Sequence, residues 1–126
     1  MKKILIFLIM LFLLGCETNT KTENKVQIIS ASVGKTMLDE SESIILLDVR
    51  TLSEYNEGHI ENALLLPLAE IQTTAETVIP DKAKTYIIYC RSGNRSRQAA
   101  DILLEMGYLN IYDMGGIIDW PYEIVY

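Results

Sequence analysis

Two strongly apolar runs, Ile44–Val49 and Thr85–Tyr89, constrain the fold more than any other feature of this sequence. Neither run alternates apolar with polar residues, as a strand with one solvated face would, so both are expected to be strands covered on two faces. Each is followed by a segment with helical features, Thr51–Asn56 and Ser96–Met106. This alternation predicts an α/β domain with a mostly parallel sheet and helices on both faces.

Three further strands and two further helices complete the expected order. The strands are Val26–Ile29, Ala63–Leu66 and Asn110–Tyr112; one helix is capped by Ser30–Ser32 and ends near Leu38, and the other is Leu68–Thr77. Ligand sites in such sheets lie outside the carboxyl ends of the strands. That rule selects two segments, Asp48–Arg50 and the residues that follow Tyr89.

The segment Cys90–Ser96 comes between a buried strand and a helix. Gly93 and Asn94 tolerate left-handed backbone angles, so the loop can curl and direct successive N–H groups inward as an anion-binding nest. The start of the helix adds free N–H groups and the positive end of its dipole. Such a site favours a thiolate over a thiol.

Positive side chains surround the same cysteine. They are Arg91, Arg95 and Arg97. Together with the N–H groups, they should hold the pKa of Cys90 below its ordinary value of about 8.5. A thiolate held by N–H donors is a nucleophile, and the same donors can hold a negative group bonded to it. The other interpretation is a small buried hydrophobic residue at a strand end, with the arginines as solvated surface.

The amino terminus has the features of an export signal. Lys2 and Lys3 precede the apolar run Ile4–Leu14, which is too short for a membrane span of roughly 20 residues. Leu13–Cys16 resembles the bacterial lipobox, and this resemblance implies cleavage before Cys16 and attachment of a diacylglycerol to its sulfur. An ordinary cleaved signal that leaves Cys16 as a free thiol is the alternative.

These features divide the chain into three parts. Residues 1–15 are expected to be a lipoprotein signal peptide, 16–25 a lipidated cysteine with a flexible polar tether, and 26–126 the folded domain. The protein is then exported and anchored through lipid to a bacterial membrane, on the periplasmic or cell-surface side. Cys90 would be the only free thiol, so no internal disulfide is expected.

Charge and composition exclude two classes of function. The formal net charge is −6 and becomes more negative once Lys2 and Lys3 are removed, so nucleic acid is not an expected partner. His59 is the only histidine, and with a single free cysteine it cannot supply a zinc site. No phosphate-binding glycine fingerprint is present. We therefore expect neither a metal nor a cofactor.

Several motifs in the domain occur in an order that resembles the single-domain rhodanese, or thiosulfate sulfurtransferase, family. The motifs are Leu47–Arg50, Glu54–Tyr55, Gly58–Ile60 with Ala63, Cys90–Ser96, and Gly115–Gly116 with Trp120. The resemblance covers about Val26 to Tyr126. It implies a parallel five-stranded sheet and a catalytic cysteine that carries a persulfide between a sulfur donor and a thiophilic acceptor.

The resemblance also implies roles for individual residues. Cys90 is the nucleophile, and the active-site loop that binds the outer sulfur is Arg91, Ser92, Gly93, Asn94, Arg95 and Ser96. Arg95 is the expected partner of a small anionic donor such as thiosulfate, and cyanide, a small thiol or a protein thiol is the expected acceptor. Asp48 and Arg50 match a supporting pair, in which the carboxylate braces the active-site loop. Arg50 could instead pair with Glu54.

The resemblance also bears on His59 and on the turn that follows it. The resemblance places His59 in a structural turn and not in catalysis. Glu61 and Asn62 stand where the family usually has Pro-Gly, and Asn62 can still adopt a left-handed turn.

Two rival functions remain open at this level. A phosphatase or arsenate reductase uses the same nest, but tyrosine-type phosphatases need an arginine six positions after the cysteine, where this chain has Ser96. A non-catalytic module could use the same fold to present a persulfide or to dock a partner, because fold alone does not settle function.

Overall fold

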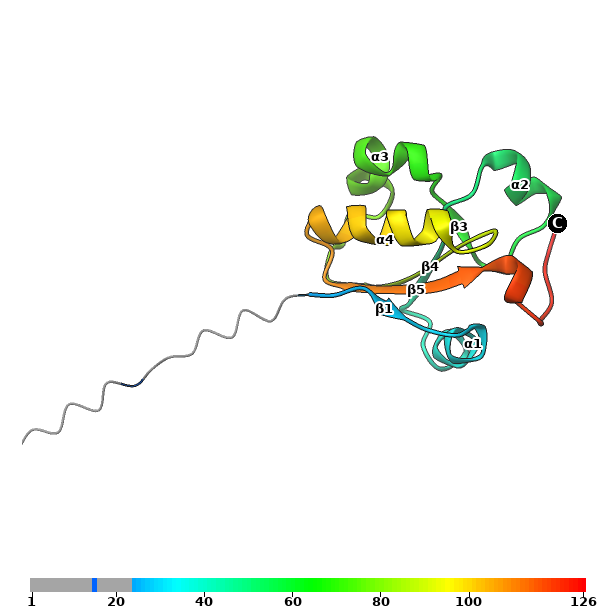
Figure 1. Cartoon of the computed structure of the whole chain (residues 1–126), viewed down its shortest axis with the longest axis horizontal. Coiled ribbons are helices and arrows are strands. Elements are labelled where there is room, and N and C mark those ends of the chain that lie inside the picture. The colour runs from blue at the N-terminus through cyan, green and yellow to red at the C-terminus, as the bar shows by residue number, and fades with distance from the viewer. Residues whose placement is uncertain (1–14, 16–23) are drawn as a thin grey trace, which may run out of the picture.

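The structure is a computed structural model that describes Gly15 and residues 24–126 (Figure 1). The predicted signal peptide, Cys16 and most of the tether lie outside the described residues. Five strands form one sheet: β1 (Gln27–Ile28), β2 (Ile45–Asp48), β3 (Leu64–Leu65), β4 (Thr85–Cys90) and β5 (Asn110–Gly116). Their order is β1-β5-β4-β2-β3 and every neighbouring pair is parallel. The predicted parallel five-stranded α/β fold is confirmed.

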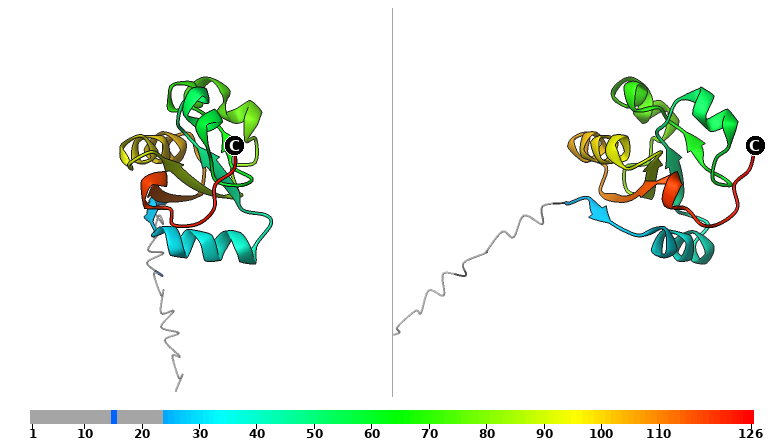
Figure 2. Two further views of the ribbon diagram at one scale, coloured as in Figure 1. Left: turned by 90° about the vertical axis from the view of Figure 1, so that its right-hand side faces the viewer. Right: turned by 45° about the vertical axis from the view of Figure 1, so that its right-hand side comes forward.

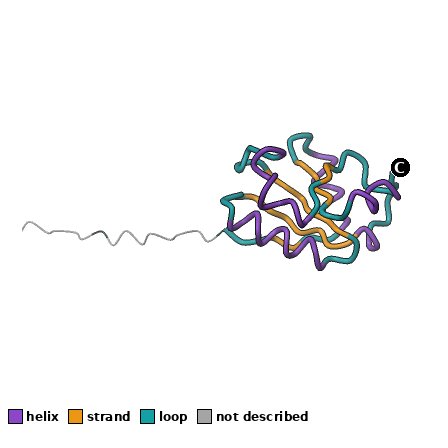
Figure 3. Tube along the Cα trace, turned by 90° about the horizontal axis from the view of Figure 1, so that it is seen from above, coloured by secondary structure: helices purple, strands orange, loops and turns teal. Residues whose placement is uncertain are grey.

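Four α-helices cover the sheet: α1 (Ala31–Glu40), α2 (Leu52–Glu57), α3 (Ile71–Val78) and α4 (Asn94–Glu105). Short 3₁₀ turns, Leu68–Glu70 and Ile117–Asp119, precede α3 and follow β5. Helices α3 and α4 lie on one face and α1 lies on the other (Figures 1 and 2). The view from above shows the strands enclosed between helices (Figure 3). None of the helices within the described residues is long and apolar enough to cross a bilayer.

Side chains of the central strand β4 alternate between two cores. Tyr86, Ile88 and Cys90 join the cluster beneath α3 and α4, whereas Ile87 and Tyr89 join the cluster on the α1 side. All five are at most 1% exposed. Both faces are buried, which is why the sequence is apolar without alternation. Cys90 therefore ends the strand on the face that α4 covers.

Several element boundaries differ from the prediction by one to four residues, and two of these differences bear on the site. Helix α4 begins at Asn94 and not at Ser96, so Arg95 and Ser96 lie in its first turn and the loop proper is Arg91–Gly93. Strand β5 continues to Gly116, although glycine normally indicates a turn. The strand continues because Gly116 pairs with Cys90, after a register shift that the Asp113 carboxylate supports by accepting the Gly115 N–H at 2.9 Å.

Candidate active site

Cys90 is the last residue of β4, and the backbone of the following loop turns back toward its sulfur. The Gly93 N–H donates to the Cys90 Sγ at 3.0 Å. Gly93 has a φ of 104°, a left-handed conformation that glycine adopts without steric cost, and this angle lets the loop lead directly into α4. The cysteine is only 1% exposed. The sulfur thus lies behind the loop, shielded from bulk solvent, with amide groups directed at it.

The environment of Cys90 favours its ionised form. Burial raises the pKa of the thiol, but hydrogen bonds from the Ser96 hydroxyl and from the N–H groups of Ser96, Gly93 and Ser92 outweigh burial, so the pKa of Cys90 lies below its ordinary value. The predicted direction is therefore confirmed. Its main cause is the local set of hydrogen-bond donors, three of them backbone groups.

Replacing Ser96 with alanine should raise the pKa of Cys90, because Ser96 is fully buried and a hydrogen bond from its hydroxyl favours the thiolate. The rate of Cys90 alkylation by iodoacetamide, followed on the Cys90 peptide by mass spectrometry, should then reach its plateau at a higher pH. Ser92→Ala is the matched control, because the exposed Ser92 contributes through its backbone N–H. An unchanged profile in Ser96→Ala would mean that the hydroxyl donates only to the Gly93 carbonyl, 3.1 Å away.

The same pKa shift makes folding stability depend on pH. A folded thiol with a lowered pKa stabilises the protein fully above the pKa of the unfolded thiol. That contribution is lost as the pH falls through the folded value.

Gly116 fixes the position of the loop from the opposite side. A Cβ atom at this position would lie 2.6 Å from the Ser92 Cα and closer still to the Arg91 carbonyl oxygen. The Arg91 carbonyl also accepts the Ile118 N–H at 3.2 Å. The end of β5 therefore packs directly against the backbone of the loop, and only glycine leaves enough room.

Gly116→Ala should displace the loop, since the φ of −109° at Gly116 suits alanine and the conflict is purely steric. We expect a loss of roughly 1–3 kcal/mol in the free energy of unfolding, together with slower alkylation of Cys90. Gly107→Ala is the control: its φ of 95° strains alanine, but no atom lies closer than 3.8 Å and the site is remote. Equal alkylation rates in both variants would contradict this role of Gly116.

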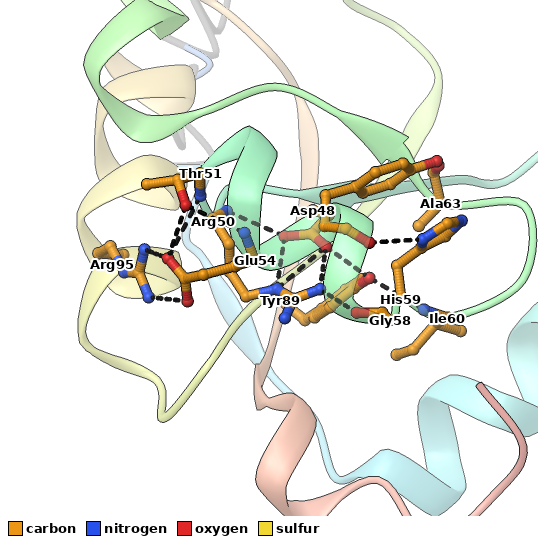
Figure 4. A network of polar contacts seen from close by, with 11 residues as sticks. Asp48, Arg50, Thr51, Glu54, Gly58, His59, Ile60, Ala63, Tyr89 and Arg95 are labelled. Carbon is orange, nitrogen blue, oxygen red and sulfur yellow. Dashed lines mark hydrogen bonds and ion pairs between the residues drawn. The ribbon is translucent and has the colours of Figure 1, made fainter. Parts of the chain in front are cut away.

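Asp48 and Arg50 form a buried ion pair beside the site (Figure 4). The Asp48 carboxylate accepts bonds from the Arg50 N–H, Nε and Nη2 at 2.7–3.1 Å, and from the Tyr89 hydroxyl at 2.8 Å. Arg50 also donates to the Gly58 carbonyl at 2.8 Å. Among the described residues, the carboxylate makes no hydrogen bond to the loop Arg91–Ser96, and it is linked to the site through Tyr89, the residue before Cys90. The pair joins β2, Tyr89 and the turn at Gly58.

Arg95 and Glu54 form a second ion pair, which differs from both sequence-based expectations (Figure 4). Arg95 Nη1 lies 2.6 Å from Glu54 Oε1, and Arg95 Nη2 lies 2.9 Å from Oε2. The alternative pairing of Arg50 with Glu54 is wrong, because Asp48 already holds the Arg50 guanidinium. Arg95, expected to meet an anionic donor, instead has both terminal nitrogens on a carboxylate.

The remaining residues of the predicted loop are placed at its rim. Arg91, Ser92 and Asn94 are exposed, as is Arg97 one turn into α4. Within Gly15 and residues 24–126, no group of three or more His, Cys, Asp or Glu side chains is placed to share a metal ion.

His59 has the structural role that the sequence indicated. Its ring stacks on Tyr55 with centroids 3.6 Å apart, and Nδ1 donates to the Tyr55 carbonyl at 2.9 Å. Its backbone bridges Val125. Asn62 has the left-handed φ of 65° that the sequence allowed.

Sequence reasoning missed three contributors to this site. They are Tyr89 as a partner of Asp48, Glu54 as the partner of Arg95, and Gly116 as the residue that admits the loop. Both hydrogen-bonded pairs join residues 41 positions apart. Only the glycine pair at 115–116 was visible as a local signal.

Comparison with known proteins is consistent with this geometry. Residues 30–121 match the family model described as a rhodanese-like domain. Thiosulfate sulfurtransferase PspE of Escherichia coli is 40% identical over 73 residues, which cover 58% of this chain and 70% of that protein. Thiosulfate sulfurtransferase GlpE of Coxiella burnetii is 37% identical over 84 residues, 66% of this chain and 77% of that one.

Solved structures agree with the fold. A rhodanese with anions from E. coli has a TM-score of 0.61 and 36% sequence identity, covering 65% of this chain and 96% of that chain. A rhodanese-related protein from Thermoplasma volcanium has a TM-score of 0.69 and 27% identity, covering 79% of this chain and 97% of that chain.

Proposed function

Because the chain belongs to the family of rhodanese-like domains, we propose that it is a sulfurtransferase that carries a sulfane sulfur atom on Cys90. The donor is a small sulfur compound such as thiosulfate, and the acceptor is cyanide or a thiol. The observation that carries the proposal is the hydrogen bond from the Gly93 N–H to the Cys90 sulfur. It places amide donors where a thiolate, and then a persulfide, needs them.

In the first half-reaction the Cys90 thiolate attacks the outer sulfur of thiosulfate. A sulfur–sulfur bond forms on Cys90, the sulfur–sulfur bond of the donor breaks, and sulfite leaves with the bonding electron pair. The negative charge moves to the outer sulfur of the Cys90 persulfide. The Ser92, Gly93 and Ser96 N–H groups are the donors available to hold it.

In the second half-reaction a thiophilic acceptor attacks that outer sulfur. Cyanide gives thiocyanate and a thiolate gives a new persulfide, and in both cases the Cys90 thiolate returns. No proton needs to move in either step when Cys90 starts ionised. The cycle therefore needs no general base. The hydrogen-bond donors of the site act on the charge of one sulfur atom, and His59 has a structural role.

Thiocyanate formation tests the proposal directly. The protein, incubated with thiosulfate and cyanide, should release thiocyanate, while an aryl phosphate should release no phosphate. The phosphatase alternative is disfavoured because Arg95 pairs with Glu54 and position 96 is a buried serine, so the arginine that would close over an oxyanion is absent from its usual place. Phosphate release without thiocyanate would overturn the assignment.

The mass of the Cys90 peptide distinguishes a sulfurtransferase from a module that only docks a partner. After thiosulfate treatment, the Cys90 peptide should gain one sulfur atom and lose it again when cyanide is added. Gain without loss would indicate a protein that presents a persulfide without turnover, and no gain would favour docking alone.

The location proposed for this activity is the outer side of a bacterial membrane, through lipid on Cys16. Support comes from the lipobox-like Leu13–Cys16. An anchor at this end of the chain would lie away from the site. Because β1 runs parallel to its neighbours, the chain enters the sheet at the amino end of β1, whereas Cys90 ends β4 at the carboxyl edge (Figure 1). Cys16→Ser should move the protein from the membrane fraction to the soluble fraction, and an unchanged distribution would refute lipid anchoring.

A further inference from the structure

The ion pair between Glu54 and Arg95 connects α2 to the first turn of α4, next to the loop that holds Cys90 (Figure 4). Both carboxylate oxygens of Glu54 face both terminal nitrogens of Arg95, at 2.6 and 2.9 Å. The side chains are 26% and 31% exposed, so the pair lies at the protein surface and is accessible to a solute. This is the bidentate arrangement that gives arginine–carboxylate pairs their geometric specificity.

Glu54 is held in place independently of Arg95. It is the third residue of α2 and forms a capping box with Thr51: its side chain accepts the Thr51 N–H, and its own N–H donates to the Thr51 hydroxyl. The Arg95 hydrogen bonds keep the pKa of Glu54 at about 2. The carboxylate is therefore ionised near neutral pH, and the capping box orients it.

The Glu54–Arg95 pair changes the charge that an anion meets near Cys90. Arg95 is close enough to Cys90 for the two charges to interact, yet the lowered pKa of the thiol is due to Ser96 and loop N–H groups. An anion that approaches the sulfur therefore meets a paired arginine whose charge is offset by a fixed carboxylate. A dianion such as thiosulfate is affected twice as strongly as a monoanion, and a neutral compound is unaffected.

We propose that Glu54 is a specificity-determining residue that withholds the positive charge of Arg95 from anionic sulfur donors. The inference rests on the proposed sulfurtransferase function and refines its substrate class. The pair removes the advantage that a dianion such as thiosulfate would gain from an unpaired Arg95, so that sulfane donors with one negative charge or none, such as low-molecular-weight persulfides, compete with thiosulfate for the site. In this arrangement Glu54 holds the Arg95 guanidinium in the ion pair, and Arg95 does not anchor the donor.

The test is Glu54→Gln in the full chain. Glutamine also completes a capping box at this position, so helix α2 is retained and only the charge is removed. The KM for thiosulfate should fall about three- to tenfold, with kcat changed less, because freeing one charge near a dianion contributes on that scale at a protein surface. The effect should shrink at high ionic strength. A KM that rises would show that Glu54 presents Arg95 to the donor, and the proposal would be overturned.

Two further variants locate the effect in this pair. Glu57→Gln removes the same charge from an exposed position of the same helix and should leave the KM unchanged. Arg95→Gln leaves Glu54 unpaired and should raise the KM for thiosulfate, whereas the Glu54→Gln/Arg95→Gln double variant should return it close to the original value. Additive effects in the double variant would contradict coupling through the ion pair. Thermal unfolding of each variant shows whether it is folded.

Alkylation separates failure of this inference from failure of the proposed function. Iodoacetate is an anion and iodoacetamide is neutral, and both react with the Cys90 thiolate without sulfur transfer. In Glu54→Gln the ratio of the iodoacetate rate to the iodoacetamide rate, measured on the Cys90 peptide, should rise several-fold, and in Glu57→Gln it should not. A raised ratio with no thiocyanate from the original protein would refute the sulfurtransferase function but support the effect of Glu54 on the charge of Arg95. Thiocyanate formation by the original protein, with the alkylation ratio and the KM unchanged in Glu54→Gln, would refute the proposed role of Glu54.

Discussion

Replacing Cys90 with serine should reduce thiocyanate formation from thiosulfate and cyanide at least about a thousandfold, to the rate without protein. A serine hydroxyl is not ionised near neutral pH, and every step of the proposed cycle starts from, or ends on, the Cys90 thiolate. Serine is close in size to cysteine and can accept the Gly93 N–H, so the loop should keep its place. The activity loss would therefore report chemistry and not unfolding.

The controls use the second cysteine and the sulfur gained from thiosulfate. Cys16→Ser should retain activity in solution, because Cys16 is proposed to act only as the lipid attachment site. The Cys90→Ser protein should gain no sulfur after treatment with thiosulfate, as judged by the mass of the peptide that spans position 90. Residual turnover within tenfold of the original protein would remove Cys90 from the mechanism altogether.

Replacing Asp48 with alanine should lower the free energy of unfolding by about 3–5 kcal/mol, the usual cost of leaving a buried charge without its partner. Asp48 is fully buried and Arg50 is 6% exposed, so water cannot replace the lost carboxylate. The Tyr89 hydroxyl would lose its acceptor as well. Urea unfolding followed by fluorescence measures the effect, since Trp120 is the only tryptophan and is largely buried.

Asp39→Ala provides the comparison for Asp48→Ala. Asp39 pairs with Lys35 at 2.6 Å, but the two side chains are 59% and 37% exposed. Such surface pairs typically contribute less than about 1 kcal/mol. If both variants lost the same small amount of stability, the Asp48–Arg50 pair would not be the structural support that its burial indicates.

The fold could be predicted from local sequence because the burial of a segment determines which of its residues are apolar. Strand β4 is apolar from Tyr86 to Cys90 because both of its faces are covered there, and this pattern is visible without any knowledge of its neighbours. The N-cap at Ser30 was equally visible, since a cap and the helix it begins are adjacent in the chain. The end of β5 was not visible, because its two glycines extend the strand only by pairing with β4.

The backbone part of the site could be predicted from the sequence. A cysteine at a strand end, followed by Gly93 and a helix, is enough to direct amide groups at one sulfur. The choice of ion partners was not predictable in this way. The four charged residues Asp48, Arg50, Glu54 and Arg95 allow more than one pairing, and the helical spacing of Arg50 and Glu54 suggested the wrong one.

The sequence alone predicted a parallel α/β domain and a cysteine with N–H groups directed at its sulfur, since both depend on residues that are neighbours along the chain. Tertiary structure decided which charges meet, because Glu54 and Arg95 lie in helices that follow different strands and come together only once β2 and β4 pair. Tertiary structure also decided that Gly116 must lack a side chain, because the Arg91–Gly93 loop packs against β5. Contacts of this kind depend on how the strands are arranged in the sheet, and no short stretch of sequence encodes that arrangement.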